Sequence, residues 1–190
     1  MFLIVGIAVV LSTNHGDTVL WMNDIHTGFL NSFFKIWTFG GDGILYGMVA
    51  LALLVFKRRY GYVFLVAGLA QGVIALLMKK VLFKGTPRPR KFFEGQHVLD
   101  LIEGVRIHDF NSFPSGHTMS AFVVATFLAM MVEKGMVKFG LLIFAVLVGI
   151  SRIYLNQHFL IDAVVGSFLG LVISTACHRS FRNYLGVNKR

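Results

Sequence analysis

The chain contains little charge and only one cysteine. Charged residues make up 14% of its 190 residues, against about a quarter in soluble domains. The single cysteine, Cys177, excludes an intrachain disulfide and so excludes a disulfide-stabilised scaffold. Acidic residues are scarce as well, with 9 Asp and Glu against 18 Lys and Arg. The basic residues fall in short clusters between apolar runs, and no nucleic-acid motif accompanies them, so we expect no nucleic-acid partner.

Apolar residues dominate the chain. Hydrophobic residues make up 56% of it, and 19 residues are Phe. Six apolar segments are separated by polar connectors, and we interpret each segment as a membrane helix. The first is short for a membrane crossing, which predicts either a longer natural N-terminus or local thinning of the bilayer. The sequence therefore predicts an all-α, polytopic membrane protein with residues 1–190 in one domain and six transmembrane helices, near 1–11, 44–56, 60–78, 118–132, 139–155 and 159–177.

An amphipathic segment lies between the first and second predicted membrane helices. Apolar residues recur there every three or four positions, which is typical of a helix that lies in the membrane interface. We expect one such helix, ended by the glycine cluster at 40–43, which is a turn rather than a nucleotide-binding loop. The apolar stripe consists of Met22, Ile25, Phe29, Phe33 and Trp37.

One connector, residues 81–114, is much longer than the others, and long loops in compact proteins are usually functional. Alternating membrane crossings place this connector, the start of the fourth helix and the turn after the fifth on the same face. If Met1 lies inside the cell, that face is the outer one. The numbers of Lys and Arg do not decide the orientation, since they are equal on the two sides.

His158 and Asp162 are four residues apart at the start of the last apolar segment, so they share one helix face. The carboxylate can accept the Nδ1–H of the imidazole, which leaves Nε2 with a lone pair. An imidazole oriented in this way serves as a nucleophile or a base. A buried pair that only joins two helices is the alternative.

Pro114, Ser115, Gly116 and His117 open the fourth apolar segment. A helix N-terminus offers free N–H groups and partial positive charge, and Ser115 and Gly116 add little steric cover, so this is a predicted anion site. His117 could then protonate a leaving oxygen. The alternative is a helix cap with a chance histidine.

Arginines in or beside membrane segments are costly and indicate a binding role. Arg152 lies near the end of the fifth segment, and its guanidinium matches the geometry of a phosphate. Arg88 stands between two prolines on the long connector. Lysines precede it at 79, 80 and 84, where anchoring of the helix end at the membrane surface is the ordinary explanation.

These motifs resemble those of the type 2 phosphatidic acid phosphatases, a membrane family that shares a superfamily with the vanadium haloperoxidases. The family motifs are K-x6-RP, PSGH and SR-x5-H-x3-D. Residues 114–117 match the second, and Ser151, Arg152, His158 and Asp162 match the third. The first matches only in part, because position 81 is Val, and the nearest lysine, Lys80, is one residue further away.

The resemblance implies the following roles. His158 attacks phosphorus, His117 protonates the leaving oxygen and Asp162 orients His158. The phosphate is bound by Lys80 (with Lys79 or Lys84 as alternatives), Arg88, Ser115, Gly116 and Arg152. No metal or other cofactor is expected, since fixed cations can neutralise the phosphate. The implied substrate is a lipid phosphate: phosphatidylglycerophosphate, undecaprenyl pyrophosphate, phosphatidic acid or a lipid A phosphate. The implied location is the outer face of a bacterial cytoplasmic membrane.

Two other classes of protein remain open at this point. A non-catalytic transporter or scaffold would also carry polar residues in membrane helices. Gly166 and Gly170 fit helix packing in either class, and we expect this packing within the bundle. A haloperoxidase is disfavoured, because the chain is predicted to be embedded in the membrane. The oligomeric state is left open.

Overall fold

The computed structural model describes residues 2–186, and these residues form helices with no named strand. This confirms the all-α prediction. The helices are α1 (Phe2–Ser12), α2 (Asp17–Asp24), α3 (Gly28–Trp37), the 3-10 helix η1 (Thr38–Gly41), α4 (Gly43–Phe56), α5 (Arg58–Leu77), the π-helical turn η2 (Met78–Leu82), α6 (Pro89–Phe92), α7 (Gly116–Met131), α8 (Gly135–Tyr154), α9 (Leu160–Ser180) and α10 (Arg182–Leu185).

The core of the bundle lies around α7, whose residues from Thr118 to Ala125 are all buried. Helix α9 packs closely against α7 because two glycines on α9 face its backbone. A Cβ atom at Gly166 would lie 2.6 Å from the carbonyl oxygen of Ser115, and one at Gly170 would lie 2.5 Å from that of Met119. The two glycines therefore pack helices within the bundle, and this packing brings the start of α9 beside the start of α7.

The chain is a multi-pass membrane protein. Within residues 2–186, three helices have the length and apolar composition of a membrane crossing: 58–82, 135–154 and 160–180. Two bent helix pairs, 3–24 and 28–56, could each add one crossing, which gives up to five. Helix α7 is apolar but has 16 residues. Helices occupy all six predicted positions, although their lengths do not by themselves establish six crossings.

The amphipathic segment is not one continuous helix, so that prediction was wrong in its extent. Helix α2 ends at Asp24 and α3 begins at Gly28. Thr27 caps α3, because its side-chain oxygen accepts a hydrogen bond from the Leu30 N–H at 3.3 Å. A threonine in this role favours a helix start, so the helix breaks here although the spacing of apolar residues continues.

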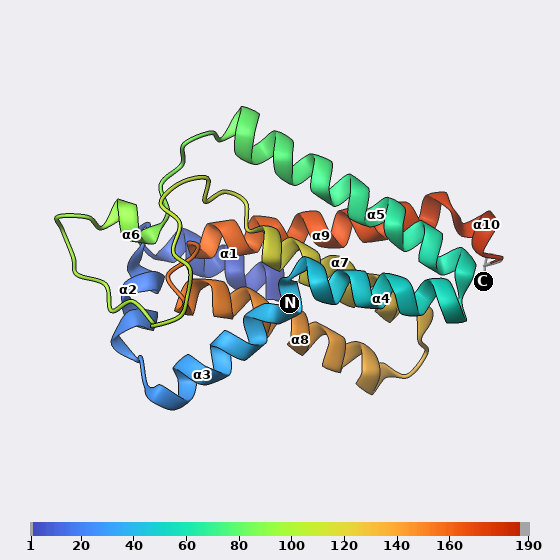
Figure 1. Cartoon of the computed structure of the whole chain (residues 1–190), viewed down its shortest axis with the longest axis horizontal. Coiled ribbons are helices and arrows are strands. Elements are labelled where there is room, and N and C mark those ends of the chain that lie inside the picture. Colours follow the sequence, from blue (N-terminus) through green and yellow to red (C-terminus); the bar gives the residue numbers. More distant parts are fainter. Residues whose placement is uncertain (1, 187–190) are drawn as a thin grey trace.

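The connections gather at the two ends of the bundle (Figure 1). One end carries α2, α3, α6 and the long connector between η2 and α7. The other end carries the α4–α5 and α7–α8 turns together with α10. Antiparallel pairing of successive helices therefore places the long connector near the starts of α7 and α9.

Candidate active site

A polar cavity of about 640 Å³ lies at the end of the bundle that carries the long connector. Helices α7 and α8, the turn before α9, and the long connector all contribute to it, together with η1 and η2. The lining residues are Lys35, Thr38, Phe39, Asp42, Lys79, Arg88, Gly104, Val105, Arg106, His108, Gly116, His117, Arg152, Leu155, Gln157 and His158. Residues from all three sequence motifs therefore meet in one place.

His158 lies in the turn between α8 and α9 and is held by Asp162. Its Nδ1 is 3.2 Å from Asp162 Oδ2, and the same oxygen accepts hydrogen bonds from the Phe159 N–H at 3.0 Å and the Ser112 hydroxyl at 2.5 Å. Three donors on one oxygen fix the carboxylate, which in turn fixes the imidazole so that Nε2 remains for a ligand.

Burial lowers the pKa of His158, and the nearby cations Arg88 and Arg152 lower it further, while Asp162 opposes them. The side chain is 1% exposed although it lines the cavity. The imidazole is therefore neutral at pH 7, which is the form with a nucleophilic lone pair.

Ser115 is the N-cap of α7, and its side chain is turned into the protein. It is fully buried, its hydroxyl oxygen accepts hydrogen bonds from the N–H and hydroxyl of Thr118, and its own N–H donates to the Asp162 carbonyl at 3.0 Å. Gly116 and His117 line the cavity instead. In the first turn of α7 their N–H groups have no intrahelical acceptor, so they are available to an anion.

Two buried guanidinium groups lie beside the histidines, and Gln157 links them. Its Oε1 accepts from Arg88 Nη1 at 3.3 Å and from Arg152 Nη2 at 3.4 Å. Arg88 Nε also donates to the Phe110 carbonyl, and Arg152 Nη1 donates to Thr38 Oγ1 at 2.6 Å. Burial lowers the pKa of Arg88, but a guanidinium stays charged in proteins. These contacts hold two positive charges in fixed positions.

Of the lysines at 79, 80 and 84, Lys79 of η2 lines the cavity and Lys80 does not. Lys79 is half-buried and lines the cavity, and its Nζ donates to the Asn111 carbonyl at 3.4 Å. Lys80 and Lys84 are exposed and do not line it. The structure therefore brings Lys79, which the sequence had left as an alternative, to the cavity in place of Lys80. A π-helical turn changes the angular position of each residue relative to an α-helix, which the motif spacing could not reveal.

Sequence reasoning missed three residues of this site. Ser112 donates to the Asp162 carboxylate, and Gln157 accepts from both arginines. Ser112 lies two residues before the second motif, and Gln157 occupies a variable position within the third. Asp42 is the only carboxylate among the lining residues of the described cavity. It follows Gly41, where a Cβ atom would lie 2.5 Å from the His117 carbonyl oxygen. The glycine cluster at 40–43 therefore does more than end a helix: it lets η1 contact the start of α7.

The chain belongs to the PAP2 superfamily, whose family model matches residues 44–185. This range contains His117 and His158 together with Arg88 and Arg152. The match confirms the family resemblance inferred from the motifs.

Among relatives, lipid phosphate phosphatase 1 of Arabidopsis thaliana is 30% identical over 192 aligned positions, covering 84% of this chain and 58% of that protein. Undecaprenyl-diphosphatase BcrC of Bacillus subtilis is 31% identical, covering 68% of this chain and 64% of that protein. The chain thus spans less than two thirds of the length of either. The crystal structure of Aquifex aeolicus LpxE is similar with a TM-score of 0.76 and 25% identity, covering 87% of this chain and 94% of that one.

Proposed function

We propose that the chain is an integral membrane phosphatase that hydrolyses the terminal phosphate of a lipid phosphate or pyrophosphate through a phosphohistidine on His158. One observation carries the proposal: His117 of α7 and His158 of the turn before α9 line a single cavity with Arg88 and Arg152. The names of the relatives, a lipid phosphate phosphatase and an undecaprenyl-diphosphatase, support the same chemistry.

In the first step, Nε2 of His158 attacks phosphorus, and the bond from phosphorus to the leaving oxygen breaks. Protonated His117 gives its proton to that oxygen, so the lipid leaves as an alcohol or a monophosphate. Asp162 keeps the Nδ1–H of His158 in place and stabilises the positive charge that develops on the ring. The phosphoryl group is then bonded to nitrogen.

In the second step, neutral His117 accepts a proton from water, and the resulting hydroxide equivalent attacks phosphorus. The phosphorus–nitrogen bond breaks, inorganic phosphate leaves and His158 is restored. Lys79, Arg88, Arg152 and the N–H groups at the start of α7 neutralise the equatorial oxygens in both transition states. Ser115 contributes by capping α7 and thereby positioning those N–H groups. Fixed cations in these positions supply the neutralisation that Mg²⁺ gives other phosphotransfer enzymes, so the proposed reaction needs no metal.

We further propose that residues 1–190 form one domain with six membrane crossings, and that α2 and α3 lie in the membrane interface. The cavity would face the outside of a bacterial cytoplasmic membrane. A cysteine at Val98, which is fully exposed on the long connector, tests this orientation in a Cys177→Ser background. Labelling of Val98→Cys by a membrane-impermeant thiol reagent on intact cells is expected. Labelling only after permeabilisation would show that the cavity faces the cytoplasm and would refute the proposed orientation.

The function is tested by phosphate release from purified protein. The substrate panel is phosphatidylglycerophosphate, undecaprenyl pyrophosphate, phosphatidic acid and a lipid A phosphate. We expect release from at least one lipid, and its loss in His158→Ala and His117→Ala. His97→Ala is the matched control, because His97 is exposed on the long connector and does not line the cavity. An unchanged rate in His158→Ala would defeat the proposal and favour a non-catalytic role.

A further inference from the structure

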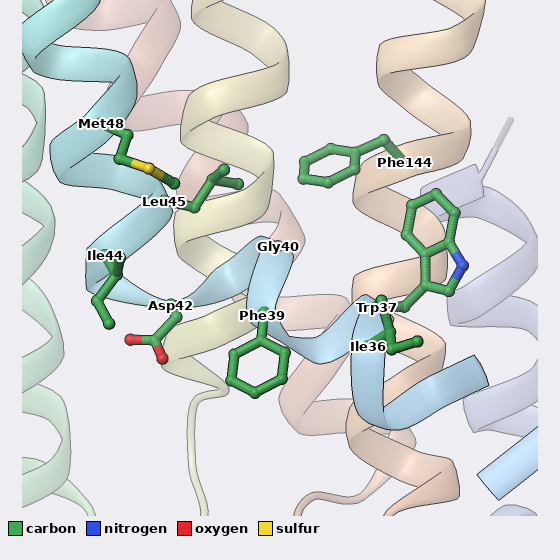
Figure 2. A pocket seen from close by; sticks show the side chains of 9 residues that line it. All are labelled: Ile36, Trp37, Phe39, Gly40, Asp42, Ile44, Leu45, Met48 and Phe144. Atoms are coloured by element: carbon green, nitrogen blue, oxygen red, sulfur yellow. The ribbon is translucent and has the colours of Figure 1, made fainter. Parts of the chain in front are cut away.

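A second cavity, of about 450 Å³, lies beside the polar cavity and is called here the apolar groove. Figure 2 shows Leu45 and Met48 of α4 on one side and Trp37 and Phe144 on the other. Apart from Asp42, the lining residues are aliphatic, aromatic or glycine. The groove therefore suits a hydrocarbon chain and offers almost nothing to a polar ligand.

The apolar groove is continuous with the polar cavity, because Phe39 and Asp42 line both. This continuity distinguishes it from another apolar pocket of about 390 Å³, which lies between α1, α2, α8 and α9 and includes Trp21. That pocket shares no lining residue with the polar cavity. A ligand with a phosphate in the polar cavity can therefore extend into the apolar groove.

Gly40 closes the inner side of the groove. A Cβ atom at this position would lie 2.7 Å from side-chain atoms of both Phe144 and Val148, so η1 packs directly on α8. From Asp42 to Met48 the groove follows α4 for a rise of about 9 Å, at roughly 1.5 Å per residue. This length accommodates the first part of a lipid tail.

On the basis of the proposed function, we propose that the apolar groove binds the hydrocarbon tail of the lipid whose phosphate lies in the polar cavity. Lipid tails in the bilayer are as apolar as the groove, so moving a tail into it adds little affinity. The groove acts by fixing the direction of the tail, which sets the position of the phosphate relative to His158 and His117.

Tryptophan fluorescence tests where the tail lies, because the chain has two tryptophans. Trp37 lines the apolar groove and Trp21 lines the separate pocket. Trp21→Phe leaves Trp37 as the fluorophore, and Trp37→Phe leaves Trp21 as the matched control. The probe is a phosphonate analogue of phosphatidic acid with brominated acyl chains, which quench nearby tryptophan and which the enzyme cannot hydrolyse.

We expect the brominated phosphonate to quench Trp37 more than brominated phosphatidylcholine at the same mole fraction, and inorganic phosphate to reverse the difference. Trp21 should respond equally to both lipids. Equal quenching of Trp37 by the two lipids, or none, would overturn the groove proposal. Phosphate release is measured in a separate assay. If no lipid in the panel released phosphate, the proposed function would be refuted, whatever the quenching result.

Filling the groove gives a kinetic test. Met48→Trp adds bulk inside it, and Leu51→Trp is the control on the same helix, since Met48 is 57% exposed and Leu51 63% but only Met48 lines the groove. We expect Met48→Trp to lower kcat for dioleoyl phosphatidic acid by about tenfold or more through misplacement of the phosphate. Hydrolysis of the dihexanoyl lipid should change much less. A similar decrease for both lipids, or no decrease, would refute the positioning role.

Discussion

Separate substitutions of Lys79 and of its neighbour Lys80 test which of the two lysines binds the phosphate. The two lysines are adjacent in η2, but only Lys79 lines the polar cavity, where its Nζ donates to the Asn111 carbonyl at 3.4 Å. Lys79→Met keeps the length of the stem and removes the ammonium group. Lys80→Met makes the same chemical change at an exposed position.

The magnitude follows from the loss of one charge-assisted contact to the transferred phosphate. A hydrogen bond to a charged group contributes about 1.5–3 kcal/mol, which corresponds to a decrease in kcat/KM of roughly 10- to 150-fold. Lys80→Met removes only an exposed charge, so kcat/KM should remain within about twofold, since exposed charges contribute little.

The assay is phosphate release from dihexanoyl phosphatidic acid in detergent micelles, with kcat and KM determined for both variants. Gel-filtration elution of each variant checks that it is folded. A larger loss in Lys80→Met than in Lys79→Met would refute the assignment of the lysine. Full activity in both variants would refute the role of η2 in phosphate binding.

Three further outcomes are expected. Asp162→Asn should lower kcat by roughly 10³- to 10⁴-fold, because the amide favours the wrong tautomer of His158. The same change at the triad carboxylate of serine proteases has an effect of this size. A loss below tenfold in the phosphate-release assay would contradict this prediction. Gln157→Leu should raise KM by about 5- to 30-fold, because Arg88 and Arg152 lose the oxygen that positions both. An unchanged KM would show that Gln157 does not contribute to substrate binding. Activity should persist in excess EDTA, and complete loss that Mg²⁺ restores would refute the metal-free reaction.

Much of the fold could be predicted because hydropathy and helical periodicity are local properties. Apolar runs predicted helices at positions that the structure fills, and the family was identified from PSGH and SR-x5-H-x3-D. The break between α2 and α3 was missed, although Thr27 carries the signal of a helix cap. The apolar stripe continues across that break, so periodicity alone favoured one helix.

The candidate site was predictable only where a motif fixes both residue and spacing. His117, His158, Asp162 and Arg152 were identified in this way. The first motif indicated Lys80, with Lys79 or Lys84 as alternatives, and the structure brings Lys79 to the cavity. The partial motif could not distinguish them, because it does not specify the conformation of the turn that carries these lysines. Ser112, which donates to the Asp162 carboxylate, gave no signal of its own.

The sequence alone was enough to identify an all-helical membrane protein of the PAP2 superfamily and to predict which histidines and arginines carry the chemistry. Only the folded chain shows which side chains share a cavity: Lys79 rather than Lys80, Gln157 between two arginines, and Asp42 with His117. It also shows the apolar groove that joins the polar cavity. The physical reason is distance along the chain. Contacts between η1, η2, α7 and the turn before α9 depend on helix packing. The spacing of Gly166 and Gly170 indicated that α9 packs on another helix, but no local pattern indicates that Gly41 lies against the His117 carbonyl.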